Sequence, residues 1–374
     1  MKLRLSLLLP IIAALLITSC KKSSNPESKP EQEYPVQIAA GYEHTLLLRS
    51  DGKVWASGFN SYGQIGSGAL SSTTNSKFVN IASDAVKISA GTHTTFIIKS
   101  DKTLWGCGNN IQGQLGLGAA REVLALTKLA DNVKDATGNY EHTLILKTDN
   151  TLWGSGTSTK GMLGDAVILP TQRAFVKITD NVMAMACGSF HSLILKTDNT
   201  LWACGLNGGG QLGDGTGTDQ FVPKKVTDNV IAVSAAHNNS LVLKKDNTLW
   251  ASGSNSWGQL GTGNDVRMMS LGKIADGVKA MWAGATCTFI LKNDDSLWAA
   301  GQNDYGQLGD GSTITRNTFV KVADNVKTLA TSFEHTVISK GTKHLFVTGK
   351  NDKGQLADGS MQNKQVFTSV AIDF

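Results

Sequence analysis

The chain has 374 residues, of which 41% are hydrophobic and 17% are charged, which is ordinary for a globular protein. Its 40 glycines follow no three-residue period, which excludes a collagen-like chain and predicts many tight turns between short strands. The net charge of +5 falls to about +3 if the first 19 residues, which hold Lys2 and Arg4, are removed, and this is too weak to indicate a nucleic-acid or membrane-surface patch.

The N-terminus predicts a secretion signal. Lys2 and Arg4 precede an apolar run over residues 5–17, which is shorter than the ~20 residues that cross a bilayer and typical of a signal peptide. The run ends in the sequence Ile-Thr-Ser before Cys20, as at the cleavage site of bacterial lipoproteins. We therefore expect a lipoprotein signal peptide over residues 1–19. An ordinary signal peptide with a chance cysteine is the alternative.

The segment after the signal predicts a lipid anchor and a tether. Acyl chains on Cys20, such as palmitate, would hold the protein to a membrane. Residues 20–35 are polar and contain three prolines, which is typical of a disordered tether. Lys21 stands where an aspartate would indicate retention in the inner membrane. The expected location is the bacterial cell envelope, lipid-anchored, with the outer membrane favoured.

A repeat of about 48 residues fills the chain from residue 36 to residue 374. Six tryptophans are separated by 50, 48, 49, 48 and 48 residues, and a phenylalanine follows after another 48. Each aromatic residue is followed three positions later by glycine, and eight positions later by Gly-Gln-Leu-Gly or a close relative. The seven aligned aromatic residues are Trp55, Trp105, Trp153, Trp202, Trp250, Trp298 and Phe346.

Each repeat predicts four short antiparallel strands, A to D. A two-residue turn such as Asp149-Asn150 joins strands B and C, as expected for a hairpin whose turn needs positive φ. Four-stranded units of this kind bury their open faces by stacking radially. The sequence therefore predicts an all-β protein, a seven-bladed β-propeller over residues 36–374. The repeated aromatic residues are expected to pack between neighbouring blades as structural core.

The repeat resembles that of the regulator of chromosome condensation family, whose members fold as seven-bladed propellers. The resemblance rests on strings such as GYEHTLLL over residues 41–48, DGKVWASG over residues 51–58 and GQIG over residues 63–66. It extends over residues 36–374. In nuclear members the propeller is a nucleotide-exchange factor for a small GTPase, using an inserted wedge and acidic residues on one face. The nearly constant spacing leaves no room for such a wedge, and secretion would separate the chain from such a partner.

A histidine lies eleven residues before the aromatic residue in four of the seven repeats, at His44, His142, His191 and His335. Sites repeated around a ring do not converge on one centre, so we expect structural histidines, each bonding a loop backbone through a buried ring nitrogen. Asparagines recur as well and are expected to cap turns, at Asn60, Asn110, Asn207, Asn255, Asn303 and Asn351. If blades and repeats are offset, the last strand pairs with the N-terminal strands and clasps the ring.

Nothing in the sequence predicts a catalytic, metal or cofactor site. Serine-elbow, HExxH, phosphate-loop and EF-hand patterns do not occur, and Gly-Asp-Gly at residues 213–215 and 309–311 is better explained by turns than by calcium loops. The four cysteines of the repeats occupy mostly different repeat positions and are expected to be small buried residues. We expect no enzyme activity, no nucleic-acid or small-GTPase partner, and a monomer.

Loop sequences indicate where a ligand would bind. The B–C and D–A turns are nearly uniform, with Thr-Asp-Asn-Thr and Ala-Asp-Asn-Val as typical forms, whereas the A–B and C–D loops vary and carry aromatic residues. Variable loops on a rigid scaffold are where binding sites are found, and Tyr and Trp are common contact residues. The candidate binding face comprises Tyr42, Tyr62, Tyr140, Phe190, Trp257, Tyr305 and Phe333.

The expected function is an extracytoplasmic binding or scaffold module that recognises a protein through this face. A carbohydrate- or envelope-binding lipoprotein is the main alternative, because exposed aromatic rings also stack on sugars, and inhibition of a secreted enzyme is a lesser one. The aromatic side chains could instead fold inward and close the mouth of the central channel.

Overall fold

The computed structural model describes residues 37–166, 170–341 and 344–371. The expected signal peptide, Cys20 and the tether lie outside these residues. The fold described here is that of the compact unit over residues 34–374, taken by itself. None of the described residues forms a helix that could cross a membrane.

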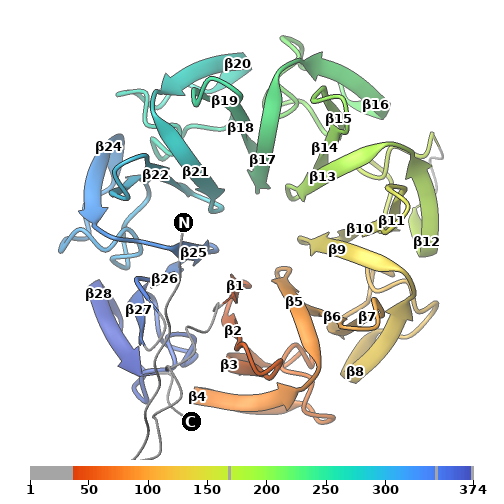
Figure 1. The fold of residues 1–374 in the computed structure, drawn as a ribbon, viewed down its shortest axis with the longest axis vertical. Helices are drawn as coiled ribbons and strands as arrows, with labels where there is room; N and C mark the ends of the chain where they lie inside the picture. The colour runs from red at the N-terminus through yellow and green to blue at the C-terminus, as the bar shows by residue number, and fades with distance from the viewer. Residues whose placement is uncertain (1–36, 167–169, 342–343, 372–374) are drawn as a thin grey trace, which may run out of the picture. The chain divides into compact units, whose positions relative to one another are not determined.

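The unit is a seven-bladed β-propeller, which confirms the predicted fold class (Figure 1). Each blade is one four-stranded antiparallel sheet whose strands follow one another in chain order, from A beside the central channel to D at the rim. The A strands are β1 (Gln37–Ala40), β5 (Ala85–Ala90), β9 (Val133–Gly138), β13 (Val182–Cys187), β17 (Val230–Ala236), β21 (Val278–Ala283) and β25 (Thr328–Thr331).

The two middle strands form the buried centre of each blade. The B strands are β2 (His44–Leu48), β6 (Thr94–Lys99), β10 (His142–Lys147), β14 (His191–Lys196), β18 (Asn239–Lys244), β22 (Cys287–Lys292) and β26 (His335–Ser339). The C strands are β3 (Val54–Asn60), β7 (Leu104–Asn109), β11 (Leu152–Thr157), β15 (Leu201–Gly205), β19 (Leu249–Gly253), β23 (Leu297–Gly301) and β27 (His344–Gly349).

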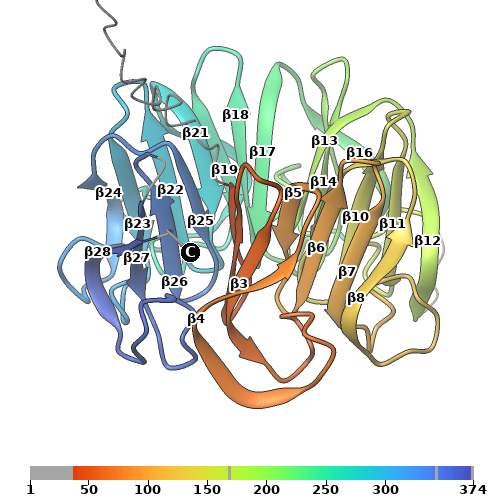
Figure 2. The ribbon, with the colours of Figure 1, turned by 60° about the horizontal axis from the view of Figure 1, so that its bottom comes forward.

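The outer strands are longer and more polar, because one side of each faces solvent. The D strands are β4 (Ser71–Ala82), β8 (Glu122–Ala130), β12 (Thr171–Thr179), β16 (Gln220–Thr227), β20 (Met268–Ala275), β24 (Arg316–Ala323) and β28 (Lys364–Ala371). Figure 2 shows the strands running from one face of the ring to the other.

The uniform B–C turns are built as the sequence predicts. In the third blade Asn150 adopts a φ of 67°, and Asp149 Oδ1 accepts hydrogen bonds from the amide and the hydroxyl of Thr151, at 3.0 and 2.7 Å. The Thr151 hydroxyl in turn accepts a hydrogen bond from Trp153 Nε1 at 2.8 Å. The turn therefore also holds the repeated tryptophan in place.

The core consists of seven apolar clusters, each lying between two neighbouring blades. The cluster between the second and third blades contains Phe96 and Leu104 from one and Val133 and Ile145 from the other. Trp153, on the third blade, packs partly buried against this cluster. The same arrangement recurs around the ring, with Phe346 in the aromatic position of the seventh blade.

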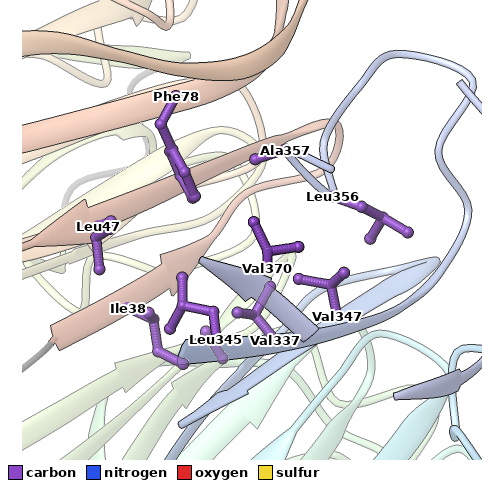
Figure 3. Packing of buried hydrophobic residues seen from close by; sticks show 10 residues of the cluster. Ile38, Leu47, Phe78, Val337, Leu345, Val347, Leu356, Ala357 and Val370 are labelled. Carbon is purple, nitrogen blue, oxygen red and sulfur yellow. The ribbon is translucent and has the colours of Figure 1, made fainter. Parts of the chain in front are cut away.

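The ring closes without strand exchange. The last strand, β28, pairs with β27, and β1 pairs with β2, so the predicted clasp between the last strand and the N-terminal strands is wrong. The first and seventh blades are joined instead by an apolar cluster like the other six, with Ile38, Leu47 and Phe78 facing residues such as Val337 and Leu345 (Figure 3). Blade and repeat boundaries coincide, so every blade is completed by its own repeat.

Candidate binding face

The A–B and C–D loops lie on the same side of the ring, which we call the A–B/C–D face; the B–C and D–A turns lie on the other. Backbone hydrogen bonds join A–B loops of adjacent blades, from Tyr42 N to Thr92 O at 3.0 Å and from Ser189 N to His237 O at 2.8 Å. This bonding fixes the loops to one another as well as to their strands. The varied side chains are therefore presented from a stiff frame.

The C–D loops share one internal brace. In the fourth blade Asn207 Oδ1 accepts a hydrogen bond from Leu212 N at 3.0 Å, while Nδ2 donates to Asp214 Oδ1 and Thr216 O, both at 2.9 Å. Equivalent bonds to the residue five positions later are made by each of the predicted asparagines, Asn60, Asn110, Asn255, Asn303 and Asn351. These residues brace loops of ten to fourteen residues rather than cap single turns.

A chain of aromatic rings crosses the mouth of the central channel on this face. Tyr42 contacts Phe333 edge-on with 5.0 Å between ring centroids, and it contacts His93 at 5.8 Å. Tyr62 lies against His93 at 4.5 Å, and His237 contacts Phe333 at 6.1 Å. These five residues are half-buried. Part of the predicted face thus packs at the channel mouth, as the inward alternative describes.

The other candidate residues differ in exposure. Tyr140 is 51% exposed and contacts Phe190 at 6.5 Å, and Trp257 is 43% exposed. Tyr305 is half-buried beneath Lys350, whose Nζ lies 5.0 Å from the ring centroid. Among the described residues of the candidate face, Tyr140 and Trp257 are the most exposed aromatic side chains.

Two residues of the aromatic chain, His93 and His237, were not among the predicted candidates. Burial lowers the pKa of His93 to about 4 and also lowers the pKa of His237, so both rings are neutral at pH 7. His237 has a φ of 46°, a left-handed conformation that a side chain such as histidine rarely adopts. Their loop positions match those of aromatic residues in other repeats, and this was the signal available in the sequence.

The end of the central channel beneath these loops forms a small cavity lined by all seven blades. Its volume is about 130 Å³, and its walls are mainly small residues of the A strands and A–B loops, among them Ala90, Gly138, Ala236 and Gly284. It has room for several waters. It is too small for a drug-sized ligand, whose pockets start at about 300 Å³.

A charged group occupies the face where the sixth, seventh and first blades meet. Lys350 Nζ lies 2.6 Å from Glu334 Oε2 and 3.9 Å from Asp352 Oδ2. Glu43 is only 9% exposed, and burial raises the pKa of its carboxyl, with Lys353 acting in the opposite direction. Burial and the Glu334 carboxylate likewise raise the pKa of Tyr42.

The repeated histidines lie inside the ring, away from this face's surface. His44, His142, His191 and His335 are fully buried, and burial lowers their pKa values to about 3, 4, 3 and 4. Each Nε2 bonds a hydroxyl of the next blade rather than the expected loop backbone: Thr95, Ser192, Ser240 and Thr45, at 3.3, 3.1, 2.9 and 2.9 Å.

The hydroxyl partner determines the histidine tautomer. Thr95 Oγ1 donates its proton to Gln64 O at 2.6 Å, so it accepts from His44 Nε2–H. The same pairing holds for Ser240, which donates to Gln211 O at 2.7 Å and accepts from His191. These neutral imidazoles link neighbouring blades and have no access to a ligand.

Within the described part of the chain, no group of three His, Cys, Asp or Glu side chains is placed to hold a metal ion. Cys107, Cys187, Cys204 and Cys287 are buried free thiols. Burial raises the pKa of Cys107 to about 12, which keeps the thiol protonated and unreactive at pH 7.

Sequence comparison supports the repeat assignment directly. Models of the Regulator of chromosome condensation (RCC1) repeat match residues 36–64, 85–114 and 184–211, and a second model of this repeat matches residues 198–243. These stretches of the chain match the RCC1 repeat. The matched stretches lie in the first, second, fourth and fifth blades, and the spacing described above extends the same repeat to all seven.

Solved structures show the same RCC1-like propeller. Human WBSCR16 superposes with a TM-score of 0.77 at 21% identity, covering 85% of this chain and 93% of that one. Prp20p from Saccharomyces cerevisiae, a protein described for its binding to Gsp1p and histones, has a TM-score of 0.77 at 18% identity, covering 90% of this chain and 87% of its own. At this identity the likeness establishes the fold alone.

Proposed function

We propose that this RCC1-like propeller is a lipid-anchored binding module of the bacterial cell envelope that recognises a protein through the A–B/C–D face. The contrast between the two faces carries the proposal. Uniform turns with mutually paired charges, such as Lys177 with Asp180 and Lys225 with Asp228, at 2.6 and 2.7 Å, cover one face. Varied aromatic loops held in a rigid frame cover the other, and rigid aromatic anchors dominate protein interfaces.

The relatives support an interaction role for the fold but supply neither the partner nor the location. Anchoring rests on the sequence around Cys20, outside the described residues. We propose that the chain is not an enzyme, since the described residues of the face offer aromatic rings and paired charges and no convergent set of nucleophile, base and oxyanion donors. A Cys20→Ala variant should leave the membrane fraction and stop incorporating an alkyne-tagged palmitate.

The contact test uses the exposed aromatic residues. The full chain and a Tyr140→Ala/Trp257→Ala variant are used as bait in cross-linking from envelope and culture-medium extracts. The matched control is Val86→Ala/Met183→Ala, which removes side chains 44% and 41% exposed on the first strands near the opposite face. A partner lost by the first variant and kept by the second supports the proposal. A partner kept by both variants would move the site away from this face.

A carbohydrate ligand is the second candidate, because Trp257 offers a 43% exposed ring on which a sugar could stack. Binding to a glycan array that disappears in Trp257→Ala alone, with no cross-linked protein, would favour it over a protein partner.

A further inference from the structure

Glu43 is a largely buried acidic residue on the A–B/C–D face whose carboxylate oxygens reach solvent. The residue is 9% exposed, and among the residues that the structure describes its carboxylate accepts no hydrogen bond and forms no ion pair within 4 Å. A carboxylate that reaches solvent from a largely buried residue is held in place and is free to accept hydrogen bonds from a cation. The charged groups that influence it are Lys353, Asp352, Lys350 and Glu334.

The side chain of Lys350 shows how this part of the face holds a positive charge. The ammonium of Lys350 lies 2.6 Å from Glu334 Oε2 and 5.0 Å from the centroid of the Tyr305 ring. A carboxylate and an aromatic face thus hold one positive charge together. Glu43 offers a second carboxylate, next in sequence to Tyr42, whose ring contacts Phe333 at 5.0 Å.

The surrounding loops have an excess of negative charge. The A–B and C–D loops of the sixth, seventh and first blades hold six carboxylates, while the cations in or beside them are Lys350, Lys353, Arg316, Lys364 and Lys77. Arg316 and Lys364 are paired with Asp310 and Asp358, at 2.7 and 3.1 Å. One negative charge remains in excess in this sector of a chain whose overall charge is +5.

We infer that Glu43 receives a lysine or arginine side chain of the protein partner, with Tyr42 and Phe333 as the adjoining aromatic rings. This inference rests on the proposed function and specifies the partner's chemistry. The third blade has the same Tyr-Glu-His motif at residues 140–142, but there the glutamate is half-buried and its tyrosine is exposed. Glu141 is therefore a matched control within the same molecule.

The probe is a random twelve-residue peptide library displayed on phage and selected on the full chain. We expect enrichment of Lys and Arg in peptides that bind the parent and the Glu141→Gln variant, and loss of this enrichment on Glu43→Gln. A selected peptide should bind Glu43→Gln at least 10-fold more weakly, and replacing its arginine by the neutral isostere citrulline should give the same loss on the parent. Lys353→Gln removes a cation that competes with the peptide for Glu43, so it should strengthen peptide binding at least 3-fold. This second variant tests the inference independently of whether Glu43→Gln folds.

Several results would overturn the inference. These are selected peptides without basic residues, equal affinity for Glu43→Gln and parent, weaker binding to Lys353→Gln, or no selected peptide at all. If peptides bind Tyr140→Ala/Trp257→Ala more weakly but bind Glu43→Gln as well as the parent, the proposed binding face is supported. The inference that Glu43 receives a basic side chain is then overturned.

Discussion

Two equivalent buried threonines allow a hydrogen-bonded hydroxyl to be compared with one that has no partner. Thr95 and Thr143 occupy the same position in successive blades, at 0% and 1% exposure. Thr95 Oγ1 bonds both His44 and Gln64 O, whereas Thr143 Oγ1, which follows the repeat that has Thr94 in place of histidine, has no partner among the described residues. The same threonine position is thus hydrogen-bonded in the second blade and has no hydrogen-bond partner in the third.

We predict that Thr95→Val lowers the free energy of unfolding by about 1–3 kcal/mol, because it leaves the buried imidazole N–H of His44 unpaired and leaves the Gln64 carbonyl with only the weak Cys107 thiol donor. Thr143→Val should change the free energy of unfolding by less than about 0.5 kcal/mol, because no bond is lost. Urea titration of both variants measures the difference. Equal losses would mean that the histidine–hydroxyl bridge contributes nothing beyond side-chain packing.

The four buried histidines predict a dependence of stability on pH. Their pKa values, about 3 for His44 and His191 and about 4 for His142 and His335, lie below the unfolded value near 6.5. Below pH 6.5 the unfolded chain therefore binds more protons than the folded one. The stabilisation is complete above this pH and is lost as the pH falls towards the folded pKa values, by about 1.4 kcal/mol per pH unit for each histidine.

The measurement is the free energy of unfolding between pH 7.5 and 5. A His142→Asn variant should show a slope reduced by about a fifth, since His93 has a comparably lowered pKa and one of five such groups is gone. His344→Gln, at an exposed position, serves as the control. If His142→Asn keeps the full slope, other groups titrate on unfolding and the buried histidines are not the cause.

At the scale of strands and loops, the regular features follow from short-range sequence patterns. The spacing of the aromatic residues and the Asp-Asn turns was sufficient to predict four strands per repeat, because a hairpin turn is determined by two adjacent residues. The loops depend on longer distances. Asn207 bonds residues five, seven and nine positions later, and His44 bonds a threonine 51 residues away, so neither partner can be identified from local sequence.

The direction of the loop side chains was likewise open. An aromatic residue in an A–B loop is equally compatible with a ring that packs at the channel mouth and with one that faces solvent. The structure gives both outcomes, with Tyr42 packed against Phe333 and Tyr140 exposed. The difference arises from which residues occupy the neighbouring loops.

At the scale of the whole molecule, the way the ring closes could not be deduced from the repeat alone. A repeating pattern has no natural beginning, so it fits equally well whether or not the last strand is shared with the first blade. In the structure the junction between the seventh and first blades resembles the others: His335 Nε2 bonds Thr45 Oγ1 at 2.9 Å, as histidines do between other blades. Closure therefore depends on side-chain packing and bridging bonds, with no shared sheet.

This closure predicts how the ring tolerates a new start point. In a circular permutant, residues 371 and 37 are joined by a flexible linker of about six residues, a length typical of connections in compact domains. Opening the chain between Asn229 and Val230, in a D–A turn, leaves every blade whole. We expect this permutant to unfold cooperatively, with a melting temperature within a few degrees of the parent.

The matched permutant opens the chain between Asp198 and Asn199, in a B–C turn, and divides the fourth blade between the two ends. The divided blade loses its central hairpin connection and should melt at a clearly lower temperature, because its second and third strands then pair only through distant chain ends. Thermal unfolding of the two proteins side by side decides the point. Equal melting temperatures would show that stability resides in the interfaces between blades, and that the individual blade is not the unit from which this ring is assembled.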